Sequence, residues 1–303
     1  MREAPQTPSE LVSVVVPTWR RAQWLERCVD AVLAQEPPPG EVLVVGRAAD
    51  AEAVAVVERR APGVRWVEVS EPGHVAPVRA ALAEARGELV VFLDDDAEPQ
   101  GEWLRTLLAP FADPRVACVG GAVVETEGSP RIPRDAGRIR WYGEFAANVA
   151  AVRTGGARDV DGVREANWAW RADVLRALDF GSLFDTDDAS MYGVDLSLQA
   201  RARGHRVVYV PTAVVAHHSA PRDPALDRAD APARTFSYSR NYTYIALRHL
   251  RGPRRLAFLA WWFLLGDPGS PGLLHVARGW RRGVPARASF GGKLAGLRAW
   301  RSA

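Results

Sequence analysis

Short β-branched runs alternate with amphipathic stretches over the first third of the chain. The apolar runs have the length and composition of buried strands, and they lie at 11–16, 41–45, 64–69 and 88–93. The segments between them carry apolar residues at helical spacing, and they lie at 21–34, 50–60 and 75–86. Four strands that alternate with three helices predict a doubly wound, mostly parallel α/β sheet with helices on both faces.

The pattern is less regular farther along the chain. A strand is predicted at 116–124, and a Gly- and Arg-rich loop over 128–162 follows it, a length that usually indicates a functional loop. Shorter elements are predicted next: helices at 172–178 and 194–202, a strand at 206–210 that Pro211 would close, and a second run at 213–216. A Pro- and Asp-rich connector at 219–233 then precedes helical pieces. We therefore expect an α/β domain over residues 1–220 and a basic, mainly helical region over 221–303.

Composition excludes several classes of protein. With 48% hydrophobic and 25% charged residues the chain is neither collagen-like nor largely disordered. The two cysteines, Cys28 and Cys118, exclude a disulfide scaffold and fit a reducing cytosol. Residues 1–10 lack the apolar core of a signal peptide, and the longest strongly apolar stretch, 256–265, is too short to span a bilayer. We expect a cytoplasmic protein, at most peripheral on the inner face of the cell membrane.

The charge is distributed unevenly. Eleven basic residues and one acid, Asp267, lie between Arg248 and Ala303, whereas the whole chain has a formal charge of only +3. The apolar stretch 256–265 (LAFLAWWFLL) lies among these arginines, a composition typical of a helix in a lipid headgroup layer. A buried helix or a homodimer contact would give the same pattern. The basic tail alone does not predict nucleic-acid binding, because no known binding module accompanies it.

An acidic triplet, Asp94-Asp95-Asp96, directly follows the fourth predicted strand. Ligands of parallel sheets bind at the carboxyl ends of the strands, and adjacent carboxylates repel one another unless a cation neutralises them. Carboxylates suit Mg²⁺ or Mn²⁺, and a histidine ligand favours Mn²⁺. His217 and His218 end a later strand and would point to opposite faces, so at most one could reach such an ion. A solvated acidic turn is the simpler alternative.

Other polar and aromatic residues are candidates for chemistry. Asp195 precedes or begins a helix, where it could act as a general base on an acceptor hydroxyl or simply cap the helix. Trp168 and Trp170 could stack against a sugar or a base, with Asn167 and Arg171 as polar neighbours. We assign these four residues to acceptor binding, with core packing of the tryptophans as the alternative.

Taken in order, several segments resemble the family 2 glycosyltransferases with the GT-A fold. The resemblance covers residues 11–218, and it rests on VSVVVPTWRRAQWLERCVDAVLAQ, EVLVV, the 73–88 stretch, VFLDDD, the 99–104 stretch, the 167–171 stretch and YGVDLSLQARARGHRVVYVPTAVVAHH. It implies inverting transfer of a sugar from a UDP-, dTDP- or GDP-linked donor to a small molecule, a glycan or a lipid-linked glycan.

The resemblance also implies roles for individual residues. Asp96 and His217, with Asp94, would hold Mn²⁺ or Mg²⁺, and Asp94 would also lie near the ribose of the donor. Asp195 matches the second acid of the family's Glu-Asp pair and would be the catalytic base. The remaining donor-binding residues are in or near the first loop and the acidic triplet: Pro17, Thr18, Arg21 and Asp95.

The sequence departs from the family pattern at several positions that contact the donor nucleotide in the family. Gly46, followed by Arg47, stands where the family usually has an acid, and Val78 and Val194 also replace expected residues. Arg47 or Arg79 would then take over a donor contact. The alternative is a catalytically degenerate protein that binds a sugar nucleotide without turnover. A nucleotidyltransferase is disfavoured, because the loop at 17–21 lacks glycine.

Overall fold

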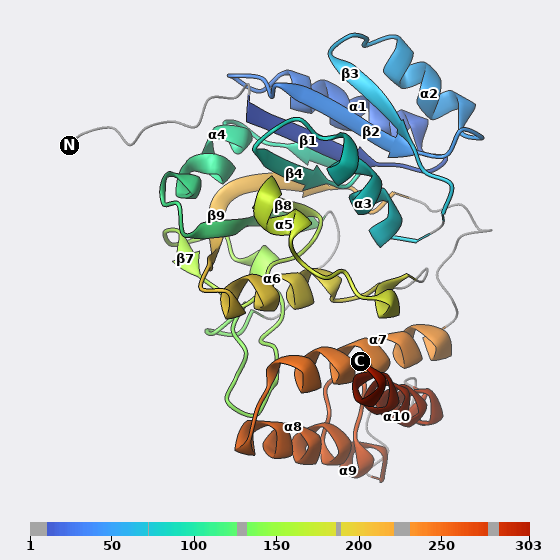
Figure 1. Cartoon of the computed structure of the whole chain (residues 1–303), viewed down its shortest axis with the longest axis vertical. Coiled ribbons are helices and arrows are strands. Elements are labelled where there is room, and N and C mark those ends of the chain that lie inside the picture. The colour runs from blue at the N-terminus through green and yellow to red at the C-terminus, as the bar shows by residue number, and fades with distance from the viewer. Residues whose placement is uncertain (1–10, 72, 126–131, 186–188, 221–230, 278–284) are drawn as a thin grey trace.

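The computed structural model describes residues 11–71, 73–125, 132–185, 189–220, 231–277 and 285–303. Within these ranges a twisted nine-stranded sheet forms the body, and a layer of helices from the C-terminal part of the chain lies beneath it (Figure 1). Residues 1–10, which we expect not to form a signal peptide, lie outside the described residues. So does most of the connector predicted at 219–233. The free cysteines Cys28 and Cys118 are both buried.

The sheet is mostly parallel, as predicted. Its strand order is β3-β2-β1-β4-β8-β6-β9-β5, and β7 pairs with β9. The pairs β3–β2, β2–β1, β1–β4 and β6–β9 are parallel, whereas β8, β5 and β7 run antiparallel to their neighbours. The strands are β1 (Val12–Pro17), β2 (Glu41–Gly46), β3 (Val64–Glu68), β4 (Leu89–Leu93), β5 (Ala97–Pro99), β6 (Val116–Glu125), β7 (Arg158–Asp159), β8 (Asn167–Arg171) and β9 (Arg206–His217).

Helices bury both faces of the sheet, which is why its central strands are apolar without alternation. In β1, Val14 and Val16 pack with the helices of one face, while Val15 packs with those of the other. The first group comprises α1 (Ala22–Leu33), α2 (Ala51–Glu58) and α4 (Trp103–Leu108). The second comprises α3 (Val75–Glu84), α5 (Ala172–Arg176) and α6 (Tyr192–Ala202). Short 3₁₀ helices lie at Ala109–Ala112, Val149–Ala151 and Ser182–Phe184.

One predicted strand boundary is wrong. Pro211 does not end a strand, because β9 continues through it to His217. The pairing of β9 with β6 skips from Val210 to Val214, which leaves Pro211 in a bulge where no ladder hydrogen bond is required of it. Because of this bulge, β9 continues as one long strand that ends at the carboxyl edge of the sheet.

The C-terminal part of the chain is helical. It contains α7 (Ala231–His249), α8 (Pro253–Leu264), α9 (Leu273–Ala277) and α10 (Ala286–Ser302). Helix α7 lies between the body and the other helices (Figure 1). Its Tyr244 and Ile245 join the core beneath α6, whereas Tyr242 and Leu247 pack with α8, where Trp262 is fully buried.

Two glycines allow α10 to approach α7 closely. A Cβ atom on Gly292 would lie 2.3 Å from the carbonyl oxygen of Phe236, and one on Gly296 would lie 2.3 Å from that of Arg240. Because no real Cβ tolerates such a distance to backbone, only glycine fits at these positions. The spacing of these glycines along α10 therefore determines where α10 can contact α7.

The same contact buries Lys293, the only lysine in the sequence. Its Nζ donates hydrogen bonds to three backbone carbonyls, those of Trp262 (2.6 Å), Ser270 (3.2 Å) and Pro271 (3.1 Å). It also lies 4.4 Å from the centroid of the Trp262 ring. Lys293 therefore satisfies the carbonyls at the end of α8 and in the turn that follows.

The Asp195 carboxylate ties α7 to the body. It is fully buried at the start of α6 and accepts hydrogen bonds from three side chains. Arg248 Nη1 lies 3.0 Å from Oδ2, His249 Nε2 lies 2.7 Å from Oδ1, and Gln199 Nε2 lies 2.9 Å from Oδ2. Arg248 also pairs with Asp179 at 2.8 Å. A buried carboxylate is tolerated here because the C-terminal turn of α7 supplies its partners.

Replacing Lys293 by methionine keeps the aliphatic volume but removes every donor. We expect Lys293→Met to lower the free energy of unfolding by about 1–3 kcal/mol, because buried carbonyls lose their partner. Urea denaturation followed by circular dichroism measures this change. Arg298→Met, at an exposed position of the same helix, is the control and should change stability by less than about 0.5 kcal/mol. Equal stability of the two variants would contradict the assigned role of Lys293.

Replacing Arg248 by methionine would leave the Asp195 carboxylate buried with less compensation. We expect Arg248→Met to cost about 3 kcal/mol, the lower end of the range for breaking one side of a buried ion pair. Thermal unfolding monitored by tryptophan fluorescence would reveal the loss. Arg251→Met, three residues on and exposed, should unfold as the wild type does. A variant at Arg248 as stable as that at Arg251 would show that the link is energetically unimportant.

Candidate functional site

An acidic cluster with one histidine forms at the carboxyl edge of the sheet. Strand β4 delivers Asp94 and Asp96, and the end of β9 delivers His217. His217 Nε2 lies 3.2 Å from Asp96 Oδ1 and 3.5 Å from Asp94 Oδ2. One ligand atom from each of the three residues lies within 4.8 Å of the others. The predicted metal-binding residues are therefore brought together.

The charges of this cluster shift its pKa values in opposite directions. Burial alone would lower the pKa of His217, but the carboxylates of Asp94 and Asp96, which lie next to its Nε2, raise it to about 10. For Asp96 the directions are reversed. Burial alone would raise its pKa, but His217, the backbone N–H of Ala220 and Arg21 lower it to about 2. In the absence of a cation, a protonated His217 thus balances an ionised Asp96.

The cluster fits a divalent cation. Oδ1 of Asp96 is buried and has no hydrogen-bond partner, although it faces His217. The second ring nitrogen of His217, Nδ1, lies 2.9 Å from Glu125 Oε2. Such a carboxylate partner is typical of metal-binding histidines, because it fixes the tautomer that leaves Nε2 free to bind the ion. Two carboxylate oxygens and one imidazole nitrogen suit Mn²⁺ or Mg²⁺.

A cavity of about 430 Å³ opens beside the cluster. Its lining is almost entirely polar, and it consists of Arg21, Asp96, Glu125, Arg164, His217, Ser219 and Ala220. Arg164 pairs with Glu125 across it at 2.6 Å. A charged cavity of this size next to a candidate cation site has the character of a phosphate-binding site.

The middle acid of the triplet serves a different purpose. Asp95 Oδ2 accepts a hydrogen bond from Thr18 Oγ1 at 2.8 Å, and Arg21 Nη1 donates to Asp95 Oδ1 at 2.9 Å. Burial raises the pKa of Asp95 to about 6, against the opposing effect of Arg21. Asp95 therefore anchors the loop after Pro17, the last residue of β1, next to the acidic cluster. The three predicted loop residues lie together at the site.

Sequence reasoning missed two residues of this cavity, Glu125 and Arg164. For Glu125 a signal was present, because it directly follows the strand predicted at 116–124; in the structure it ends β6 and lies opposite His217 of β9. Nothing in the sequence marks Arg164, which lies in the irregular segment before β8. His218 points away from the cluster, as the alternation predicts: its ring packs 5.2 Å from that of Trp24.

The unusual Gly46 has a steric cause. A Cβ at this position would lie 2.4 Å from the ring of Trp66, so the indole excludes any side chain there. The next residue, Arg47, stacks on Trp19 at 4.8 Å from the ring centroid. The indole N–H of Trp19 is buried and has no hydrogen-bond partner. A cationic and aromatic pair thus stands at the end of β2, where the family pattern has an acid.

Arg79 lies apart from this group. Its Nη1 donates to Asp185 at 2.6 Å, and its guanidinium packs over the ring of Phe180. Among the described residues, no hydrogen bond or ion pair joins Arg79 to the acidic cluster or to Trp19. Its assignment to the donor therefore gains no geometric support, whereas Arg47 keeps its place among the donor-binding candidates.

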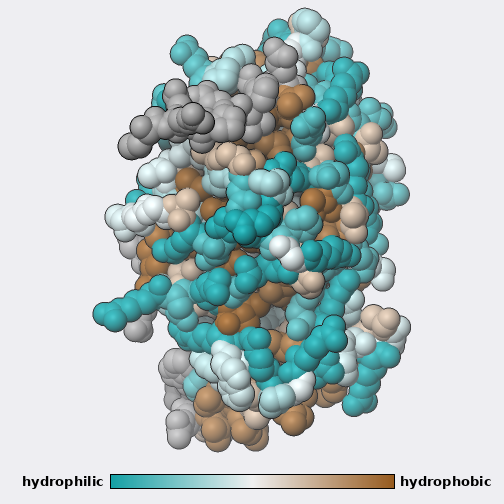
Figure 2. All heavy atoms as spheres, turned by 60° about the vertical axis from the view of Figure 1, so that its left-hand side comes forward, coloured by the Kyte–Doolittle hydropathy of each residue, from teal (hydrophilic) through white to brown (hydrophobic). Residues whose placement is uncertain are grey.

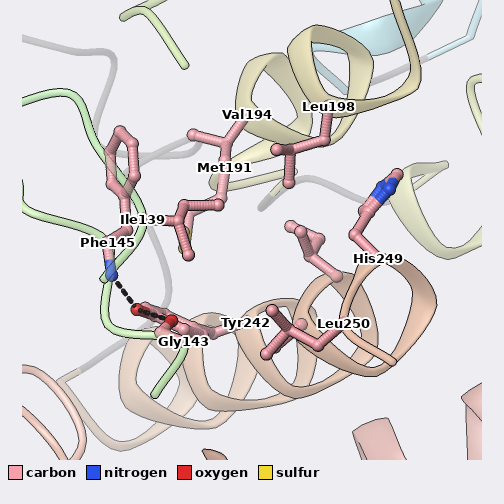
Figure 3. Close-up of a pocket in the computed structure, with 11 residues that line it drawn as sticks. Ile139, Gly143, Phe145, Met191, Val194, Leu198, Tyr242, His249 and Leu250 are labelled. Atoms are coloured by element: carbon pink, nitrogen blue, oxygen red, sulfur yellow. Dashed lines mark hydrogen bonds between the residues drawn. The ribbon is translucent and has the colours of Figure 1, made fainter. Parts of the chain in front are cut away.

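The structure gives no geometric support to the predicted role of Asp195 as catalytic base. Its carboxylate is fully buried, and Arg248, His249 and Gln199 occupy its oxygens. It is not the N-cap of α6 either, since Met191 holds that position. Between α6 and α7, apolar residues and His249 line a cavity of only about 20 Å³, enough for about one water molecule (Figure 3).

The acceptor assignment of Asn167, Trp168, Trp170 and Arg171 likewise gains no geometric support. These residues form β8, an internal strand of the sheet, where the first three are completely buried. Asn167 donates to the carbonyls of Ala122 and Ala213 and accepts from Trp103. Arg171 donates to backbone carbonyls, including that of Val116. The alternative interpretation, core packing, explains both tryptophans, and the other two residues hold neighbouring segments together.

Comparisons with known proteins agree with this geometry. The sequence profile of a family described as glycosyltransferase like family 2 matches residues 8–231. A pre-mycofactocin glycosyltransferase of Mycobacterium tuberculosis is 30% identical over 251 residues, which make up 81% of this chain and 50% of that protein. The chain spans half or less of the length of the curated relatives it matches.

Two solved structures share the fold. The mannosyltransferase PcManGT from Pyrobaculum calidifontis, in complex with GDP-Man and Mn²⁺, aligns with a TM-score of 0.60 at 20% identity, over 96% of this chain and 86% of that one. S. aureus TarS 1–349, in complex with UDP-GlcNAc, aligns with a TM-score of 0.61 at 15% identity, over 96% and 89%. At these identities the two likenesses establish the fold, which is of the GT-A type. Because the family profile covers well over half of the sequence, the chain belongs to glycosyltransferase family 2.

Proposed function

We propose that this chain is a metal-dependent, inverting glycosyltransferase that moves a sugar from a nucleotide-diphosphate donor to an acceptor hydroxyl. The observation that carries the proposal is the cluster of Asp94, Asp96 and His217 beside a charged cavity. A divalent cation held by these residues would stabilise the charge that develops on the departing diphosphate. Mn²⁺ is favoured over Mg²⁺ because one ligand is a nitrogen.

The chain's own residues support donor binding around this cluster. Arg21 and Arg164 line the cavity and offer guanidinium groups to phosphate oxygens. Trp19 and Arg47 present a stacking surface and an unpartnered indole N–H at the neighbouring strand end, which suits a nucleobase. The two neighbours of known structure carry a guanosine and a uridine donor, so the base itself is left to experiment.

We assign donor chemistry to residues 1–220 and acceptor or surface contacts to 221–303. Exposed leucines form the outer face of α8 and α9: Leu256 is 70% exposed, Leu264 46% and Leu273 55%. Hydrophobic side chains gather at the lower end of the molecule, where these helices lie (Figure 2). None of the helices in the described ranges has the length and apolarity needed to cross a membrane.

We propose that this leucine surface rests on an anionic membrane. Leu256, Ala260 and Leu264 follow each other at helical spacing on the exposed side of α8, while its buried side faces α7. The part of the chain from Arg248 onward carries eleven basic residues against one acid. Apolar side chains that face outward next to such a positive charge match the headgroup layer of anionic lipids. A lipid-linked acceptor would then reach the site from the same surface.

A nucleotide that needs Mn²⁺ to bind would support the donor site directly. We expect one of UDP, GDP, dTDP and ADP to raise the melting temperature when Mn²⁺ is present and not in its absence. A ligand at 100 times its dissociation constant stabilises the native state by about 2.7 kcal/mol. Differential scanning fluorimetry of the purified chain provides the measurement.

Asp96→Ala should abolish this shift, because it removes the ligand with the unpartnered oxygen. Glu102→Ala, at an exposed acid outside the cluster, should keep it. The absence of any Mn²⁺-dependent shift in the wild type would contradict the proposed function. A shift without release of nucleotide from any sugar nucleotide would instead favour the degenerate binder.

Binding to vesicles tests the leucine surface. We expect sedimentation with phosphatidylglycerol vesicles, weakened by salt, and little sedimentation with phosphatidylcholine. The double substitution Leu256→Ser and Leu264→Ser should weaken binding at least about tenfold, because burying each apolar side chain contributes about 1 kcal/mol or more.

Ile132→Ser is the matched control, since Ile132 is 44% exposed but lies outside α8 and α9. The proposal fails if the double variant binds vesicles as tightly as this control does. A double variant that changes only the sedimentation coefficient in the absence of lipid would assign the surface to a second copy of the chain.

A further inference from the structure

With Asp195 engaged by α7, the proposed reaction needs another carboxylate to accept the proton of the acceptor hydroxyl. An acceptor hydroxyl is a poor nucleophile until a base removes its proton, and such a base must lie free of a permanent cationic partner. Asp95 is held by Arg21, and Asp94 and Asp96 belong to the candidate metal cluster. The base must therefore come from another acid at the same edge of the sheet.

Glu165 stands at that edge. Strand β8 runs antiparallel to β4 with Asn167 opposite Leu93, so the residues just before β8 lie beside those just after β4. Glu165 is two residues before Asn167, and Asp94 directly follows Leu93. The pairing thus places Glu165 next to the acidic triplet, at the edge where the donor is proposed to bind.

The start of α6 holds the Glu165 carboxylate in place. Its Oε1 accepts a hydrogen bond from the backbone N–H of Gly193 at 2.8 Å. A Cβ on Gly193 would lie 2.7 Å from Cγ of Glu165 and 2.8 Å from Oε1. The missing side chain of residue 193 therefore creates the space that this carboxylate fills.

The charge state of Glu165 suits a proton acceptor. Among the described residues no cation forms an ion pair with it, and the residue is half-buried. Burial, with a contribution from the charge of Asp94, raises its pKa, while the hydrogen bond from Gly193 and the charge of Arg164 act in the opposite direction. Burial, with a smaller contribution from the charges of Glu165 and Asp94, also raises the pKa of the neighbouring Tyr192.

We propose that Glu165 is the general base of the transfer reaction. The acceptor oxygen forms a bond to the anomeric carbon while the bond from that carbon to the diphosphate oxygen breaks. The nucleoside diphosphate leaves with the electron pair of the broken bond, and the acceptor proton passes to the Glu165 carboxylate. This inference rests on the proposed function, because it assigns a further residue to the same reaction.

Glu165→Gln separates the base from a structural role. Glutamine keeps an oxygen that can accept the hydrogen bond of Gly193 but cannot take up the proton. With GDP-mannose, UDP-GlcNAc and dTDP-glucose as probes, and Mn²⁺ present, release of the nucleoside diphosphate is measured. We expect kcat to fall at least about 100-fold while KM for the donor and the Mn²⁺-dependent thermal shift stay unchanged. Asp195→Asn, assayed well below its melting temperature, should keep most of the turnover.

A second variant pair tests the position of the carboxylate. Glu165→Ala should be as inactive as Glu165→Gln, and adding Gly193→Asp should recover part of the turnover by supplying a carboxylate from the neighbouring backbone. Wild-type turnover in Glu165→Gln, or loss of its thermal shift, would overturn the assignment of the base alone. A wild type that binds nucleotide with Mn²⁺ but releases none would overturn the proposed function and the base together.

Discussion

Mutual repulsion among carboxylates at one edge of the sheet is the constraint on which the site depends. Asp94, Asp95 and Asp96 follow one another at the end of β4, while Glu125 ends β6 and Glu165 lies just before β8. Charges of one sign at such distances must be neutralised locally. Each neighbouring segment therefore carries a donor or a cation to this edge. The first loop provides Arg21, and the end of β9 provides His217.

This constraint explains why the carboxyl edge could be predicted in outline from the sequence. Alternating strands and helices determine a parallel order, and parallel order brings the carboxyl ends of distant strands together. The acidic triplet and the Pro17 loop consequently had to meet, and a strand ending in His217 was the natural third contributor. The doubly wound sheet and the helical C-terminal region follow from the same periodicities.

The residues whose predicted roles gain no support from the structure have contacts that no local sequence pattern indicates. Trp168 and Trp170 stand on a strand covered on both sides, so their aromatic character reflects the core and not a ligand platform. The partners of Asp195 lie more than 50 residues farther along the chain, at the end of α7. The position of Glu165 depends on a side chain that Gly193 does not have. The effect of a missing side chain on another segment becomes apparent only when the structure shows that the two segments are in contact.

The burial of Lys293 gives the chain a built-in chemical reporter. Because it is the sole lysine, its ε-amine is the only side-chain amine that an amine-selective acylating reagent could modify, and the fit of α10 against α7 shields it. Labelling at this residue would therefore proceed only when α10 separates from α7, at a rate set by that local opening. The extent of modification over time would thus follow the dynamics of the helical layer independently of the sheet above it.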